Sequence, residues 1–162
     1  MLALVYYDTR VALTMDTQMT ENREQKSEKI LKEKDNTKLK IRTVRDLKIY
    51  NLAYDLAMEV YVLTSKFPKE ETYSLTDQIR RSSRSVAMNI REGFAKRKYE
   101  QVFVRQLNDA FGSSEETRGW LNFALDCKYL PKDKHVDMDK KYDELNAMIY
   151  SLMNNWENFS HD

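Results

Sequence analysis

Polar side chains capable of chemistry crowd residues 81–93, a stretch that otherwise has the periodicity of a helix. Residues three and four positions apart on a helix are neighbours, so guanidinium, hydroxyl, amide and carboxylate groups can meet there as a catalytic or ligand-binding set. By spacing, however, no histidine or lysine base is within reach, and a half-buried polar set must satisfy its own hydrogen bonds. We therefore expect a hydrogen-bonded network at a seam between helices or subunits. Its members would be Arg81, Ser85, Asn89 and Glu92, joined by Glu116 from a later segment.

The same segment also carries a basic stripe. At 100° per residue, four basic side chains fall close together and away from the apolar face. Residues 73–98 hold seven Lys or Arg against two Asp or Glu, whereas residues 131–162 hold four against seven. Arginine matches phosphate geometry and displaces counterions on binding. The stripe predicts contact with RNA or DNA, and a solvated face or an acidic protein partner is the alternative. Its members are Arg80, Arg84, Arg91 and Lys98.

The residues needed for familiar enzyme chemistry are scarce. The chain has two histidines, His135 and His161, and a single cysteine, Cys127, so neither a zinc-ligand spacing nor an intrachain disulfide can be built. It has no glycine-rich phosphate loop, no nucleophile-elbow motif and no histidine at the spacing after arginine that all-helical ribonucleases use. We expect no catalytic residues, no metal and no cofactor.

The elements that must position these side chains are helices. Three glycines and two prolines leave little turn punctuation, and apolar residues recur every three to four positions in four segments. The segments are about 45–67, 74–94, 99–128 and 131–156, separated by short links. Ser74 and Asp77 have the spacing of a capping box. Short links place successive helices antiparallel, which predicts an all-α, up-down-up-down four-helix bundle over residues 44–159.

Residues 1–43 differ from the bundle. Most of this segment is polar, so it cannot bury enough apolar surface to offset the entropy of ordering, and we expect a disordered or loosely helical extension. Translation could also begin at Met15 or Met19. The apolar start is too short and too poorly flanked for a signal peptide or membrane span, which favours a cytoplasmic protein without a membrane partner.

The first helix carries a second apolar stripe, away from its core face. Tyrosine and methionine are enriched in interfaces, so this stripe predicts a contact between copies of the chain. Ordinary surface tyrosines, or tyrosines that stack on bases, are the alternatives. The stripe consists of Tyr50, Tyr54, Met58 and Tyr61.

Several blocks resemble one family. The core block is Arg81-Ser82-x-x-Ser85-Val86-x-x-Asn89-Ile90-x-Glu92-Gly93, and others are Phe67-Pro68-Lys69-Glu70-Glu71 and Ala110-x-Gly112-Ser113-x-x-Glu116. Over about residues 44–130 the chain is similar to the four-helix-bundle proteins encoded in intervening sequences of bacterial 23S rRNA genes. The resemblance implies a homopentameric ring, and similar bundles are accessory proteins of diversity-generating retroelements that engage nucleic acid. The chain departs from the family pattern at Ala87, Met88, Arg91 and Thr117.

The residues and the resemblance together predict a non-enzymatic, oligomeric four-helix bundle that acts as a scaffold or adaptor and contacts RNA or DNA through the basic stripe. The alternative is a protein–protein interaction module that binds no nucleic acid. A nuclease or toxin-like enzyme is a third reading.

Overall fold

The computed structural model describes residues 41–155, which form four long helices and two short 3₁₀ turns and contain no strand. The predicted extension and the alternative start sites lie almost wholly outside these residues, as does the end of the predicted bundle. The elements are η1 (Val44–Asp46), α2 (Lys48–Thr64), η2 (Lys69–Glu71), α3 (Leu75–Ala95), α4 (Glu100–Asp126) and α5 (Lys132–Asn154).

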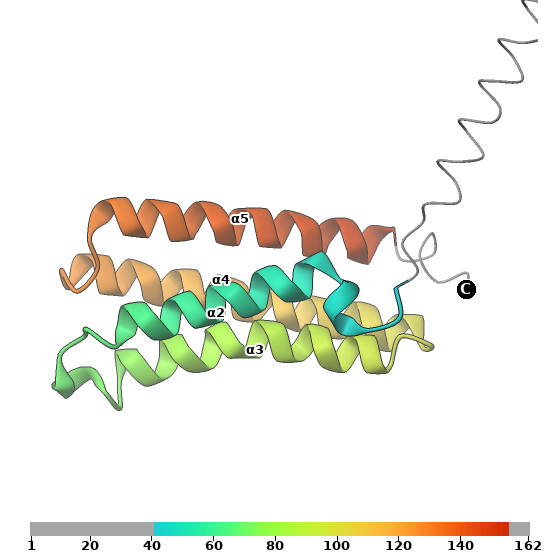
Figure 1. Cartoon of the computed structure of the whole chain (residues 1–162), viewed down its shortest axis with the longest axis horizontal. Coiled ribbons are helices and arrows are strands. Elements are labelled where there is room, and N and C mark those ends of the chain that lie inside the picture. The colour runs from blue at the N-terminus through green and yellow to red at the C-terminus, as the bar shows by residue number, and fades with distance from the viewer. Residues whose placement is uncertain (1–40, 156–162) are drawn as a thin grey trace, which may run out of the picture. The chain divides into compact units, whose positions relative to one another are not determined.

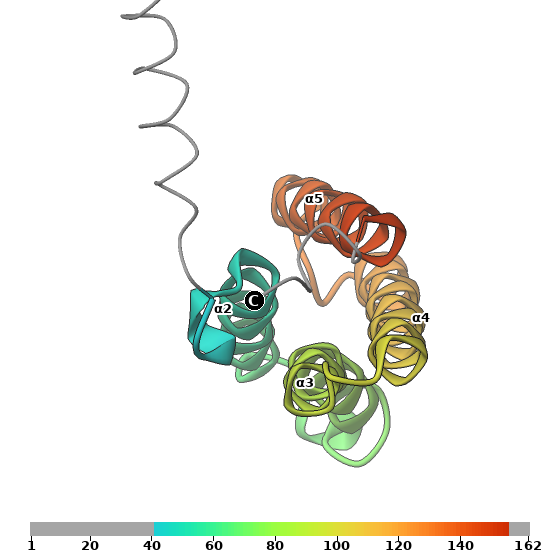
Figure 2. The same cartoon turned by 90° about the vertical axis from the view of Figure 1, so that its right-hand side faces the viewer.

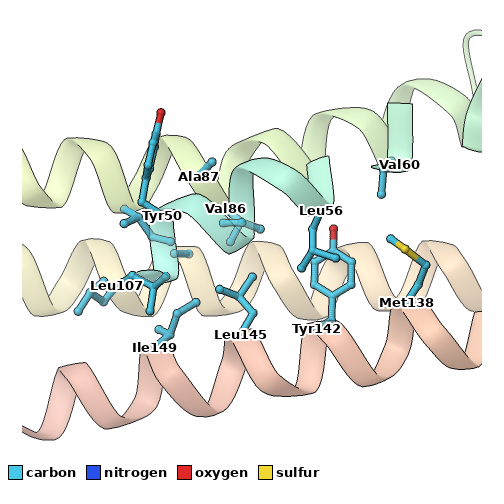
Figure 3. Packing of buried hydrophobic residues seen from close by; sticks show 14 of the residues in the cluster. Tyr50, Leu56, Val60, Val86, Ala87, Leu107, Met138, Tyr142, Leu145 and Ile149 are labelled. Carbon is cyan, nitrogen blue, oxygen red and sulfur yellow. The ribbon is translucent and has the colours of Figure 1, made fainter. Parts of the chain in front are cut away.

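Successive helices run in opposite directions and surround one core (Figures 1 and 2). Seen end-on, α3 lies between α2 and α4, and α5 closes the ring between α4 and α2. The predicted antiparallel four-helix bundle is therefore confirmed. Large side chains from all four helices fill the interior, as Figure 3 shows. They include Leu56, Val60, Ile79, Val86, Ile90, Phe103, Leu107, Leu121, Met138, Leu145 and Ile149.

The first helix begins differently from the expectation. It divides at Leu47, whose extended backbone (φ −81°, ψ 117°) separates η1 from α2. Asp46 stabilises this start because its carboxylate accepts hydrogen bonds from the backbone N–H groups of Thr43 (2.7 Å) and Arg42 (2.9 Å). Those bonds hold the pKa of Asp46 below its usual value. A capping box, which sequence reasoning placed at the second helix, is thus present at the start of the first.

The capping box predicted at Ser74 is not formed. Its hydroxyl donates to the carboxylate of Glu71, and the same carboxylate accepts the backbone N–H of Leu75 at 3.3 Å. Tyr129, in the α4–α5 connection, also donates its hydroxyl to Glu71 (3.3 Å). One carboxylate thus caps α3 and joins two connections at the same end of the bundle, which the spacing of Ser74 and Asp77 could not reveal.

Ion pairs tie α5 to both of its neighbours. Glu59 of α2 accepts hydrogen bonds from Lys134 and from Lys141, the second with an Nζ–Oε2 distance of 3.0 Å. On the other side, Arg118 of α4 contacts Asp139 (2.8 Å) and a further α5 carboxylate. The hydrogen bond to Asp139 is the main reason that the pKa of Arg118 lies above its usual value. These ion pairs neutralise much of the charge on α5, the segment that is acidic overall.

The seams of α3 are held by other means. Between α3 and α4, the hydroxyl oxygens of Ser82 and Thr117 lie 2.9 Å apart within the core. Between α2 and α3, Arg80 donates its Nε–H to the hydroxyl of Thr64 at 2.7 Å. No carboxylate takes part in either contact. In the described part of the chain, the arginines of α3 therefore form no ion pair with an acidic residue of another helix.

Three enclosed polar atoms of the described region lack a hydrogen-bond partner: Ser114 Oγ, Tyr142 Oη and Asn146 Oδ1. Tyr142 is 1 % exposed and points from α5 toward Leu56 of α2 (Figure 3). Burial raises the pKa of this phenol, and no hydrogen bond of ordinary geometry joins it to nearby Thr117. These groups lower the free energy of unfolding, because a buried polar group without a partner loses its hydrogen bonds to water and gains none in return.

Candidate nucleic-acid interface

Two of the four predicted stripe residues stand free on α3. Arg84 and Arg91 are exposed, and neither has an ionic or hydrogen-bonded partner among residues 41–155. They are seven residues apart, which is about 10.5 Å along a helix. Their guanidinium groups are therefore free to bind an external anion.

Arg80 does not belong to the free set. Its side chain is half-buried, bonded to Thr64, and lies over the ring of Tyr61 with the guanidinium carbon 4.7 Å from the centroid. Its Nη2 is also 3.4 Å from the carbonyl oxygen of Tyr61. The angle of 100° per residue places Arg80 on the same side of α3 as Arg84, but its side chain is bound by residues of α2. It is a link between α2 and α3 rather than an open phosphate ligand.

Arg81 replaces Arg80 on the outer face. It was expected in the polar network, yet it is exposed and makes no hydrogen bond or ion pair within residues 41–155. It shares its outward direction with the exposed side chains of Asp77 and Met88, which are four and seven residues away on the same helix face. The unpartnered arginines of α3 are therefore Arg81, Arg84 and Arg91.

Basic residues continue past the end of α3. Lys98 is exposed in the turn before α4. Lys96 pairs with Glu92 one turn away, which keeps that carboxylate out of the polar network. Arg97 packs its guanidinium over the ring of Phe94, 4.1 Å from the centroid, and donates to the carbonyl oxygen of Phe94. The end of α3 thus adds one unpaired lysine to the basic surface.

A smaller polar network than expected lies at the α3–α4 seam. Asn89 donates from Nδ2 to Ser85 Oγ (3.3 Å) and to Ser113 Oγ (3.4 Å), and the two hydroxyl oxygens are 3.0 Å apart. Ser113 was missed as a member, although it stands in a block that carries the family resemblance. Glu116 instead accepts the indole N–H of Trp120 at 3.2 Å. The network is neutral, which suits a contact that joins two helices.

The tyrosine stripe of α2 is only partly exposed. Tyr50 is 4 % exposed and belongs to the core, although its hydroxyl points away from α5 (Figure 3). Tyr54, Met58 and Tyr61 are 41 %, 47 % and 45 % exposed, and Val62 beside them is 59 % exposed. The sequence period could not separate Tyr50 from Tyr54, because the burial of each ring depends on the side chains that other parts of the chain pack against it.

The exposed tyrosines and the arginines of α3 form one surface. Buried Ala57 and Ala87 lie seven residues from Thr64 and Arg80, the pair that joins α2 to α3, and therefore on the same sides of their helices as that pair. Among the carboxylates nearest in sequence, Glu59 binds α5 and Glu92 pairs with Lys96, whereas Asp55 and Asp77 are exposed and make no ion pair within residues 41–155. We call this surface the α2–α3 face. It comprises Arg45, Tyr54, Tyr61, Arg80, Arg84 and Arg91.

The described residues contain no group of His, Cys, Asp and Glu side chains arranged to hold a metal ion. None of their helices combines the length and apolar character needed to cross a bilayer. Cys127 is exposed and unpaired at the end of α4.

The fold and this surface define a four-helix bundle with a basic and aromatic outer face. The chain belongs to the family of 23S rRNA-intervening sequence proteins, whose sequence model matches residues 45–151. The family resemblance inferred from the residues is thus confirmed. A crystallised protein of unknown function from the S23 ribosomal protein family of Bacteroides thetaiotaomicron is similar in fold, with a TM-score of 0.60. It is 23 % identical, and the match covers 65 % of this chain and 97 % of that one. No curated protein matches the chain.

Proposed function

We propose that this protein is a non-enzymatic scaffold that binds RNA or DNA through the outer face of α3. The observation that carries the proposal is the set of three exposed arginines, Arg81, Arg84 and Arg91, with no carboxylate partner in the described region. By contrast, ion pairs join α5 to both neighbouring helices: Arg118 of α4 pairs with Asp139, and Glu59 of α2 pairs with Lys134 and Lys141.

Phosphate is the ligand that this arrangement suits. Each guanidinium can donate two parallel hydrogen bonds to one phosphate, and each contact releases condensed counterions. Three such contacts predict a slope of about −2 to −3 in log affinity against log salt, from about −0.7 to −0.9 for each phosphate. Contacts to the backbone carry no sequence information, so the affinity should change little when the nucleotide sequence is scrambled.

The test is a fluorescence-anisotropy titration of labelled RNA and DNA with the variant Arg84→Glu/Arg91→Glu. The matched control is Lys132→Glu/Lys140→Glu, which changes two exposed, unpaired lysines of α5 by the same charge. We expect the α3 variant to lose most of its affinity and the control to retain it. Equal affinity of both variants and the wild type would refute the proposal, and equal losses would show that only total charge matters.

A second candidate activity, self-association, is favoured by the exposed apolar residues of α2. Tyr54, Met58, Tyr61 and Val62 lie within two and a half turns, and tyrosine and methionine are enriched in interfaces. A homo-oligomer, such as the ring that the family resemblance implies, could use this stripe. Sedimentation of Met58→Glu/Val62→Glu against wild type tests it, because a true interface would dissociate and an unused surface would not.

The alternative to nucleic-acid binding is a protein adaptor whose arginines meet an acidic partner. The two functions differ in one preparation. A protein partner would remain bound after nuclease treatment, whereas bound nucleic acid would disappear together with its absorbance at 260 nm.

A further inference from the structure

The α2–α3 face combines free positive charge with aromatic rings, and exposed Asp77 lies seven residues before Arg84 in the same row of α3. Tyr54 and Tyr61 are 41 % and 45 % exposed, and Tyr61, seven residues after Tyr54 on the same side of α2, contacts Arg80 of α3. Arg84 and Arg91 stand unpartnered across the seam. Arginines alone would bind any polyanion. The exposed rings favour a polyanion that also has flat groups able to stack on them.

Both tyrosine rings are held in place by arginines. Arg80 lies over Tyr61 at 4.7 Å, and Arg45 lies over Tyr54 at 5.4 Å. Tyr50 adds a second support, because its ring centroid is 6.3 Å from that of Tyr54. A ring restrained in this way loses little conformational entropy when a ligand stacks on it. The guanidinium groups also contribute cation–π attraction to the same surface.

We infer that the α2–α3 face binds unpaired nucleotides, with bases stacked on Tyr54 and Tyr61 and phosphates held by Arg84 and Arg91. This inference rests on the proposed nucleic-acid function and adds a preference for single strands over duplex. Duplex bases are stacked on one another, so their faces are covered, whereas every unpaired base offers a face to an aromatic side chain.

The spacing of the two rows supports one strand running along the seam. Tyr54 and Tyr61 are seven residues apart on α2, as are Arg84 and Arg91 on α3, so each pair spans about 10.5 Å. A nucleotide strand advances about 3.4 Å per base when its bases are stacked and further when they are not, so 10.5 Å spans at most about three steps. Rows of matching length, one aromatic and one cationic, can therefore follow the bases and the backbone of the same strand.

The experiment compares three fluorescein-labelled ligands of equal length by anisotropy: oligothymidine, its duplex with oligoadenosine, and an abasic strand that keeps the phosphates. The proteins are wild type, Tyr54→Ser/Tyr61→Ser and Arg84→Glu/Arg91→Glu, with Tyr73→Ser as the control. Tyr73 is 93 % exposed in the connection before α3, outside the proposed surface. Melting curves check that each variant is folded, and sedimentation is run on each one.

We expect wild type to bind oligothymidine more tightly than the duplex or the abasic strand. The tyrosine variant should lose at least about fivefold for oligothymidine, the lower end for one stacked base, and little for the abasic strand. Tyr73→Ser should bind like wild type. The arginine variant should lose affinity for all three ligands.

Four results would overturn the inference. Equal wild-type affinity for the three ligands would remove the role of the bases while leaving phosphate binding intact. Unchanged binding by the tyrosine variant would remove the role of these two rings. Dissociation of an oligomer together with the loss of binding would assign the tyrosines to contacts between copies. Absence of binding to any ligand would refute the proposed function itself, and the inference with it.

Discussion

Gly93 offers the sharpest test of the packing between α3 and α4. It is buried, and a Cβ added there would lie 2.9 Å from Cβ of Gln106 and 3.1 Å from the ring of Phe103. Real Cβ atoms almost never approach so closely, and a Cβ cannot rotate away as the end of a long side chain can. Gly93→Ala must therefore move the helices or the Phe103 ring.

The expected size of the effect follows from two opposing contributions. Replacing glycine by alanine inside a helix gains about 1 kcal/mol of helix propensity. Overpacking a core costs about 1–3 kcal/mol, and the rigid contact to Gln106 places Gly93 at the upper end. We expect Gly93→Ala to lower the free energy of unfolding by about 1–2 kcal/mol.

Gly112 and Gly119 supply matched controls on α4. A Cβ added at either position meets nothing within 4 Å, so Gly→Ala there should raise stability by up to about 1 kcal/mol. Urea denaturation followed by circular dichroism at 222 nm measures all three variants. If Gly93→Ala stabilised the protein as much as Gly112→Ala, the close approach of α3 and α4 deduced from the structure would be wrong.

Further predictions concern the other seams. Burial raises the pKa of Glu59, but hydrogen bonds from Lys134 and Lys141 outweigh it and hold the pKa below the usual value. A depressed carboxyl pKa stabilises the fold above the unfolded value near 4.5 and loses that effect as pH falls through the folded one. The destabilisation by Glu59→Gln should therefore be larger at pH 7 than at pH 3.5, in urea titrations at both; a constant difference would exclude the ion pairs as its cause. Tyr142→Phe should be neutral or stabilising by up to about 1 kcal/mol in thermal melts, and a larger loss would reveal a bonded hydroxyl. Asn89→Ala should cost about 1 kcal/mol by the same measurement, whereas no change would mean that water replaces its two bonds.

The helices could be predicted from the sequence because their cause is local. Apolar residues at three- to four-residue spacing must share one side of a helix, and that side must be buried. The apolar residues that recur at this spacing in α3, which are Leu75, Ile79, Val86, Ile90 and Phe94, are all buried in the structure. Leu63 and Leu125, which continue the apolar spacing near the ends of α2 and α4, are only half-buried. The ends of the bundle have fewer neighbours, a property that periodicity does not contain.

The candidate site could be predicted less completely. Sequence angles identified α3 as the basic helix, and they placed Arg84 and Arg91 on its outside. They did not distinguish Arg80, which Thr64 and Tyr61 of α2 hold, from Arg81, which no described residue holds. The difference depends on residues more than fifteen positions away, so no local pattern carries it.

The amino-acid sequence by itself determined the helical class, the four segments, their antiparallel order and the family, because each follows from residues close together in the chain. Only the tertiary structure decided which polar side chains remain available. It buried Tyr50 and left Tyr54 exposed, and it brought Ser113 to Ser85 and Asn89. The physical reason is that availability depends on the partner a side chain finds across a helix seam, and that partner is set by packing.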